Sequence, residues 1–126
     1  MENLILAYLG DAVYELYVRN HLINSGIANV NELQNKSLKY VSATSQRQIL
    51  EKLINENILT AEEQEIVRKG RNSKSHKSKT TDVVTYHMAT GFECLIGYLY
   101  KNNKARLEEI MEEILWEFVE KMSLEN

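Results

Sequence analysis

Apolar positions recur at helical spacing along most of this chain, and they divide it into segments that we expect to be helices. The predicted helices cover residues 3–24, 29–37, 42–55, 61–69, 82–100 and 104–122. No segment alternates apolar and polar residues for long, and the chain contains no proline. Because proline strongly interrupts a helical backbone, its absence suits long helices. We therefore expect an all-α fold.

Polar residues mark the predicted helix starts, because their side chains can accept hydrogen bonds from the first free backbone amides. The expected N-caps are Asn29 or Asn31 for the second helix, Thr60 in a capping box with Glu63 for the fourth, and Thr80 or Thr81 for the fifth. Between the fourth and fifth helices, residues 70–80 contain no apolar side chain. We expect this segment to be a loop.

Two of the predicted helices are far more apolar than the others, and each carries an isolated carboxylate. Residues 4–18 contain only two charged residues, Asp11 and Glu15, and residues 83–100 contain one acid, Glu93. A buried carboxylate is costly unless a cation, a hydrogen-bond network or a metal ion accompanies it. Bonding to a neighbouring helix would explain either acid alone. Two such acids favour a shared Mg²⁺ ion, which takes carboxylate, water and phosphate oxygens and supports phosphodiester hydrolysis.

Gly10 precedes Asp11 in the middle of the first predicted helix, where glycine costs about 1 kcal/mol relative to alanine. Because Gly10 has no side chain, another backbone can approach closely beside Asp11. Farther along the same helix, Glu15 lies four residues before Arg19, a spacing that favours a salt bridge.

The length and composition suit one soluble domain that spans residues 1–126 and buries a substantial core. The single cysteine, Cys94, excludes an internal disulfide, and its apolar flanks predict a buried, unreactive thiol. No secretory leader is recognisable at the start of the sequence. Glu93, His87 and two threonines argue against a membrane span over residues 83–100. We therefore expect a cytoplasmic protein.

Charge is distributed unevenly, although the formal net charge is only −3. Residues 68–81 carry six cations and no acid, whereas the remainder of the chain carries nine cations and all 18 acids. A solvated loop has such a composition, but beside a metal site these cations favour contacts with nucleic-acid phosphates. The absence of aromatic residues favours a duplex over stacked single strands. The residues expected to bind RNA are Arg68, Lys69, Arg71, Asn72, Lys74, Lys77 and Lys79.

Both acids lie in motifs that resemble the ribonuclease III family. Residues 8–13 (YLGDAV) resemble the signature helix of that family, and residues 92–97 (FECLIG) resemble its second acidic helix. The resemblance covers nearly the whole chain, and residues 6–11, 68–72 and 81–82 are also similar to the short Mini-III branch. That branch consists of the catalytic domain alone, without a double-stranded-RNA-binding domain.

The resemblance implies a helical-bundle homodimer that cleaves double-stranded RNA endonucleolytically with Mg²⁺ and leaves 5′-phosphate ends. It assigns metal binding and catalysis to Asp11 and Glu93. It also implies maturation of the ends of 23S ribosomal RNA, on a precursor already bound by a large-subunit ribosomal protein. The helix that contains Gly10 is expected near the dimer interface, so that two active sites lie along one duplex groove.

The chain departs from the family at two acidic positions. The family at large has one acid four residues before the signature aspartate and another three residues before the second glutamate; here these positions are Ala7 and Thr90. Thr90 is able to hold a metal-bound water, and Glu32 is a candidate for a further family acid. The reduced acid set leaves open whether one or two metal ions bind.

Two other interpretations remain open at the level of sequence. The first is a ribonuclease III-like module that has lost catalysis and binds ribosomal RNA, an interpretation that Ala7 and Thr90 favour. The second is a helical interaction protein whose acidic last helix is the partner surface. The second interpretation leaves the two isolated acids unexplained.

Overall fold

The structure is a computed structural model that describes residues 2–73 and 82–119, with side chains described as far as Trp116. Every regular element within these ranges is helical, which confirms the all-α prediction. The elements are α1 (Asn3–Asn24), α2 (Val30–Val41), α3 (Ala43–Asn55), α4 (Ala61–Arg71), α5 (Val83–Asn102), α6 (Lys104–Glu112) and the π-helical segment η1 (Glu113–Val119). Within the described residues, no helix is long and apolar enough to cross a membrane.

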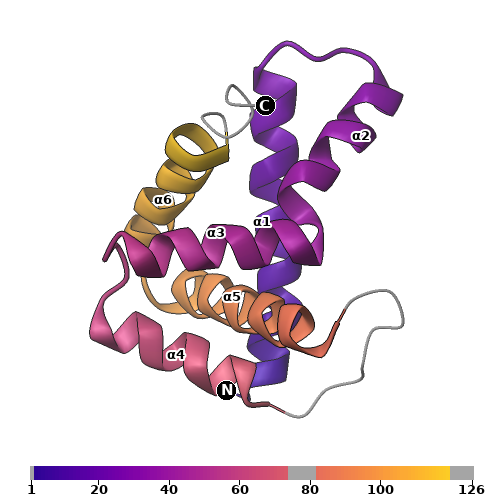
Figure 1. Cartoon of the computed structure of the whole chain (residues 1–126). Coiled ribbons are helices and arrows are strands. Elements are labelled where there is room, and N and C mark those ends of the chain that lie inside the picture. The colour runs from indigo at the N-terminus through magenta and orange to yellow at the C-terminus, as the bar shows by residue number, and fades with distance from the viewer. Residues whose placement is uncertain (1, 74–81, 120–126) are drawn as a thin grey trace.

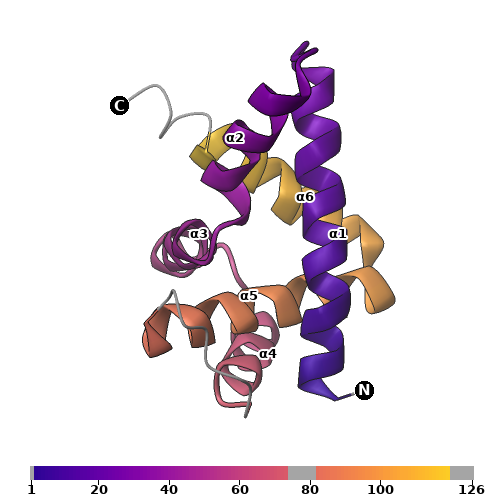
Figure 2. The same ribbon diagram turned by 90° about the vertical axis from the view of Figure 1, so that its right-hand side faces the viewer.

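Helix α5 lies at the centre of this arrangement. Figures 1 and 2 show α1 crossing α5 at a steep angle, with α3 and α4 packed along opposite sides of α5. Because α5 has neighbours on several sides, its apolar residues are buried nearly all around the helix. This explains why its sequence is continuously apolar rather than amphipathic.

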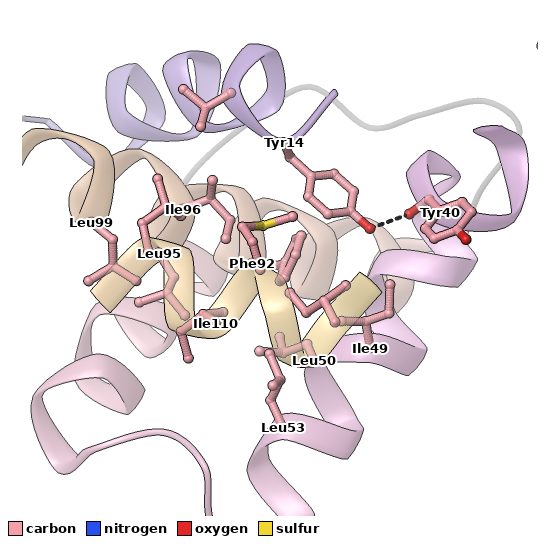
Figure 3. Packing of buried hydrophobic residues seen from close by; sticks show 14 of the residues in the cluster. Tyr14, Tyr40, Ile49, Leu50, Leu53, Phe92, Leu95, Ile96, Leu99 and Ile110 are labelled. Carbon is pink, nitrogen blue, oxygen red and sulfur yellow. Dashed lines mark hydrogen bonds between the residues drawn. The ribbon is translucent and has the colours of Figure 1, made fainter. Parts of the chain in front are cut away.

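The core forms where α1, α3 and α6 meet the apolar side chains of α5 (Figure 3). Phe92 is fully buried and packs edge-on against Tyr14 of α1, with the ring centroids 5.0 Å apart. The Tyr14 hydroxyl donates a hydrogen bond of 2.8 Å to the carbonyl oxygen of Tyr40 at the end of α2. This contact satisfies a buried polar group and attaches α2 to the core.

The sequence identifies the helix starts well. Asn29, Ser42 and Thr60 cap α2, α3 and α4, and Thr60 forms the predicted capping box with Glu63. The prediction of Thr80 or Thr81 as the cap of α5 is wrong, because Asp82 occupies that position. Its carboxylate accepts hydrogen bonds from the backbone amide and the hydroxyl of Thr85, at 2.9 and 2.8 Å.

Helix α4 continues two residues beyond its predicted end, through Gly70 and Arg71. Gly70 is buried where α4 crosses α5, and a Cβ atom at this position would lie 3.0 Å from the Cα atom of Gly91. A Cβ atom at Gly91 would in turn lie 2.8 Å from the carbonyl oxygen of Val67. Gly70 is therefore a close-packing position in the helix and not the start of a loop.

The last predicted helix is also corrected. It is α-helical only as far as Glu112 and then π-helical from Glu113 to Val119, and residues 120–122 of the prediction lie outside the described residues. Ile114 and Leu115 remain buried in this segment. Since apolar spacing is nearly the same in the two kinds of helix, periodicity does not distinguish them.

Candidate active site

The candidate site lies where α1 crosses α5, and the crossing depends on two glycines. A Cβ atom at Gly10 would collide with the carbonyl oxygen of Glu93, and one at Gly97 would collide with the carbonyl oxygen of Leu6. The two backbones are thus in direct contact, as the position of Gly10 beside Asp11 suggests. This contact brings Asp11, the next residue of α1, to Glu93 of α5.

Asp11 and Glu93 face each other as a carboxylate pair, as predicted. Burial of Glu93 is the largest cause that raises its pKa, to about 8, and a hydrogen bond with Asp11 and the charge of Asp11 raise it further. Asp11 itself is exposed in the single chain. Such a pair repels itself when both groups are ionised, and a divalent cation between them would remove that repulsion.

A third side chain, Gln46 of α3, completes this cluster, and the sequence analysis missed it. The Gln46 amide forms a hydrogen bond with Glu93 that offsets part of the pKa increase. Gln46 is buried, and it lies three and four residues before the core residues Ile49 and Leu50. A polar residue in register with an apolar stripe was the signal that was available in the sequence.

The two residues that depart from the family pattern, Ala7 and Thr90, are both buried. Ala7 is buried in a small apolar cluster with Leu6 and Cys94, so an acid at position 7 would displace apolar packing. Thr90 is also buried, and its hydroxyl donates a hydrogen bond of 3.0 Å to the carbonyl oxygen of Tyr86. Among the described residues, no group of three or more His, Cys, Asp or Glu side chains is suited to hold a metal ion.

The donor set nevertheless fits one hydrated Mg²⁺ ion. Two carboxylates in contact supply the hard oxygen atoms that Mg²⁺ prefers, and Mg²⁺ ordinarily keeps several of its water ligands. The Gln46 Oε1 atom is buried without a hydrogen-bond partner among the described residues, so the site also contains an unused acceptor. The residues present are therefore compatible with a metal ion held by two carboxylates.

The other acids considered from sequence have partners elsewhere. Glu15 forms the predicted ion pair with Arg19, with Oε2 and Nη2 3.3 Å apart. Glu32 is exposed and lies 3.6 Å from the Nζ atom of Lys36. Neither glutamate is among the groups that shift the pKa of Glu93. Cys94 is buried as predicted, and burial raises the pKa of its thiol to about 11, which leaves it unreactive.

The predicted RNA-binding residues gather at the C-terminal end of α4 as far as the structure describes them. Exposed side chains there are Arg68, Lys69, Arg71 and Asn72, whereas Lys74, Lys77 and Lys79 lie outside the described residues. Arg68 is paired with Glu65, with Nε and Oε2 2.9 Å apart. None of these cations is among the groups that shift the pKa of Glu93, so they form a surface distinct from the acid pair.

A pocket of about 380 Å³ opens beside that surface, between the end of α4 and the start of α5. It is lined by Arg71, Asn72, Val83, Val84 and His87. The Nδ1 atom of His87 is buried and has no hydrogen-bond partner among the described residues. The pocket offers both charge and hydrogen-bonding groups, and sequence reasoning did not connect His87 with the basic segment.

Comparison with known proteins identifies the family of this chain. The family model of the ribonuclease III domain matches residues 4–104. Mini-ribonuclease 3 of Streptococcus pneumoniae is 45% identical over 113 residues, which cover 88% of each chain. That of Symbiobacterium thermophilum is 48% identical over 111 residues, covering 86% of this chain and 84% of its own.

A solved structure shows the same fold. The crystal structure of a protein from Fusobacterium nucleatum superposes with a TM-score of 0.80 at 30% identity, covering 90% of this chain and 92% of that one. Fold and sequence together define the class of this protein as an endoribonuclease with a ribonuclease III domain. Within that class the chain belongs to the Mini-ribonuclease 3 family.

Proposed function

We propose that this chain is a Mg²⁺-dependent endoribonuclease in which Asp11 and Glu93 bind the metal ion. The observation that carries this proposal is the facing carboxylate pair. The groups that shift the pKa of Glu93 include no cationic side chain, so none of them neutralises the pair. A bound Mg²⁺ ion supplies activation of a water and stabilisation of the leaving oxygen in phosphodiester hydrolysis. Asp11 and Glu93 would hold this ion, and Gly10 keeps the two helices close enough for both carboxylates to contribute.

The proposed substrate is double-stranded RNA, in particular the ends of precursor 23S ribosomal RNA in the cytoplasm. Membership of the Mini-ribonuclease 3 family and the basic end of α4 support this assignment. Arg68, Lys69, Arg71 and Asn72 contact phosphates and sugars without reading sequence, together with the lysines at positions 74, 77 and 79. The expected products carry 5′-phosphate and 3′-hydroxyl ends. A large-subunit ribosomal protein on the precursor is a proposed partner.

We further propose that the active form is a homodimer that pairs through α1. One face of α1 carries large apolar side chains that no other described element covers: Ile5, Tyr8, Leu16 and Ile23 are 52%, 83%, 60% and 56% exposed. An uncovered stripe of this kind along a helix is typical of a protein interface. Asp11 lies on the same helix, so pairing through α1 would place two acid pairs near one duplex.

Cleavage of a long duplex RNA tests the metal site. With Mg²⁺ the protein should produce shorter fragments, and EDTA, Asp11→Asn and Glu93→Gln should each abolish them. Glu15→Gln is the matched control, because Glu15 lies on the same helix but pairs with Arg19, and it should retain cleavage. If Asp11→Asn or Glu93→Gln retained wild-type cleavage, the assignment of the metal site would be wrong. If the wild type cleaved only a precursor with ribosomal protein bound, the same variants would be compared with that precursor as the substrate.

Light scattering during size-exclusion chromatography tests the dimer. The wild type should have twice the mass of one chain, and Leu16→Glu should shift it to the mass of a monomer. Leu38→Glu is the control, because Leu38 is similarly exposed, at 59%, but belongs to α2 and not to the exposed apolar face of α1. A monomeric wild type would contradict the proposal.

A further inference from the structure

The Gln46 side chain is the feature of the acid cluster that the proposed function does not use. It comes from the first turns of α3 and is 3% exposed. Its Nε2 atom donates a hydrogen bond of 3.2 Å to the carbonyl oxygen of Val41, which fixes the amide at the α2–α3 junction. Its Oε1 atom is buried without a partner among the described residues. The Nε2 atom of this amide therefore has a structural role, whereas the Oε1 atom has none among the described residues.

A buried acceptor without a donor is costly, by about 1–3 kcal/mol. The neighbours of Gln46 within the site do not relieve this cost, because the proton that Glu93 retains at its raised pKa is held in the hydrogen bond with Asp11, and both carboxylates are acceptors only once that proton has left. A hydrated divalent cation satisfies all three groups together, since it binds the carboxylates and its water ligands donate hydrogen bonds. The same cation would therefore explain both the facing acids and the unused amide oxygen.

We propose that Gln46 is a positioning residue for the cation, and that its Oε1 atom accepts a hydrogen bond from a water ligand of the ion. The inference rests on the proposed function of Asp11 and Glu93. According to this inference, α3 contributes a neutral oxygen atom to the site. Two acids that the family at large has in its site are replaced in this chain by Ala7 and Thr90. Ala7 offers no equivalent group because it is packed in an apolar cluster, and Thr90 donates its hydroxyl hydrogen to the carbonyl oxygen of Tyr86 within α5.

Gln64 provides a matched control within the same chain. Gln46 follows its N-cap, Ser42, by four residues, and Gln64 follows its N-cap, Thr60, by the same number. The Nε2 atom of Gln64 donates to the carbonyl oxygen of Leu59 at 3.3 Å, which is the counterpart of the bond from Gln46 to Val41. Gln64 is exposed. A change at this position removes the same structural bond at a residue that is not among the groups that shift the pKa of Glu93.

The test is thermal unfolding of the full chain, without RNA, over a titration of MgCl₂. Binding to the native state raises the melting temperature of the wild type as Mg²⁺ increases. For Gln46→Leu, the Mg²⁺ concentration that gives a fixed rise in melting temperature should be about tenfold higher, as is typical when a group that orients metal ligands is lost. Without metal, Gln46→Leu should be at least as stable as Gln64→Leu. Gln64→Leu should leave the Mg²⁺ requirement unchanged.

A purely structural role for Gln46 gives the opposite pattern, with a lower melting temperature in EDTA and an unchanged Mg²⁺ titration, and would overturn the inference. A second variant, Gln46→Glu, keeps the shape and adds a charge, so it should lower the Mg²⁺ requirement and destabilise the metal-free protein. An unchanged requirement in Gln46→Glu would also overturn the inference. Asp11→Asn separates the two proposals. If Asp11→Asn loses the Mg²⁺ shift and Gln46→Leu keeps it, only the role of Gln46 is wrong; if the wild type shows no shift, both are wrong.

Discussion

Two glutamates in the helical core, Glu63 and Glu93, are removed from water in opposite ways. Glu63 stands at the start of α4 with 7% of its side chain exposed, and the Arg106 guanidinium of α6 donates hydrogen bonds of 2.8 and 2.9 Å to its two oxygens. These bonds hold the pKa of Glu63 below its ordinary range. Glu93 faces the carboxylate of Asp11 instead, and its pKa is raised to about 8 by burial and by Asp11.

Under the proposed function, this difference is the one between a structural carboxylate, Glu63, and a metal-binding carboxylate, Glu93. Arg106 also donates a hydrogen bond of 2.7 Å to the carbonyl oxygen of Ile58, so the Glu63 pair ties α6 to the start of α4 and the segment before it. The chain itself therefore supplies both the balancing charge and the hydrogen bonds for the Glu63 carboxylate. Glu93 has hydrogen bonds with Asp11 and Gln46 but no cation among the groups that shift its pKa, and under the proposed function the balancing charge is a metal ion from solution. Burial of an acid alone does not indicate a site, but burial against a second acid does.

The largest expected effect is on catalysis. Glu93→Gln should reduce duplex cleavage by on the order of a thousandfold, since a metal ion contributes several kcal/mol of transition-state stabilisation. The same change should leave stability in EDTA equal or higher, because the amide retains a hydrogen bond to Asp11 and removes the repulsion. Single-turnover cleavage and urea unfolding measure the two effects. A large loss of stability in Glu93→Gln would show that Glu93 is structural, like Glu63.

Glu63→Gln should show the reverse. The change leaves the Arg106 guanidinium with a neutral partner in a largely buried position, and it should lower the free energy of unfolding by about 3 kcal/mol. Arg106 is 21% exposed, which keeps the expected value at the lower end of the range for buried pairs. Urea unfolding in EDTA measures the change. Cleavage per folded molecule should remain within a few-fold of the wild type, and a catalytic defect as large as that of Glu93→Gln would contradict the comparison.

The stabilisation from Glu63 should depend on pH in a defined direction. Arg106 lowers the pKa of Glu63 from its ordinary value of 4.5, so the unfolded chain binds the proton more readily than the native one. The stabilisation is therefore fully present above pH 4.5 and is lost as the pH falls through the lowered pKa. Unfolding of the wild type and of Glu63→Gln at several pH values should show a constant difference near neutrality that shrinks in acid. A difference that grows in acid would be inconsistent with this pKa shift.

The smallest of these effects should come from Gly10→Ala. The new Cβ atom collides with the backbone of Glu93, so α1 must move away from α5, at a cost of about 1–3 kcal/mol. The movement separates Asp11 from Glu93, and the Mg²⁺-dependent rise in melting temperature should shrink, whereas the Glu63–Arg106 pair is unaffected. Ala12→Gly, at an exposed position of the same helix, controls for helix propensity. An unchanged Mg²⁺ response in Gly10→Ala would show that the crossing does not set the site.

The acid pair was predictable because each carboxylate is isolated in a long apolar sequence, and the helix starts were predictable because capping is local. Interactions between residues that are distant in the chain were not predictable from the sequence. The sequence shows Glu63 as a capping residue, but nothing near it indicates Arg106, 43 residues later. Gln46 was overlooked because it is one of two glutamines in an amphipathic helix, and glutamine is typical of the solvated face of such a helix. The π-helical winding of η1 was not predictable, because it hardly changes the spacing of apolar positions.

Helix α5 is crossed closely by α4 at Gly91 and by α1 at Gly97, and these two crossings limit how the structure of this enzyme can change in evolution. Gly91 and Gly97 are six residues apart, which is about 9 Å along a helix, and Glu93 lies between them. Helix α4, which ends in the basic residues, is fixed at one crossing, and α1, which carries Asp11, is fixed at the other. Because backbone contacts set both positions, substitutions of neighbouring side chains have little influence on this spacing. A change in the distance between these two crossings should therefore require a change at the glycines themselves.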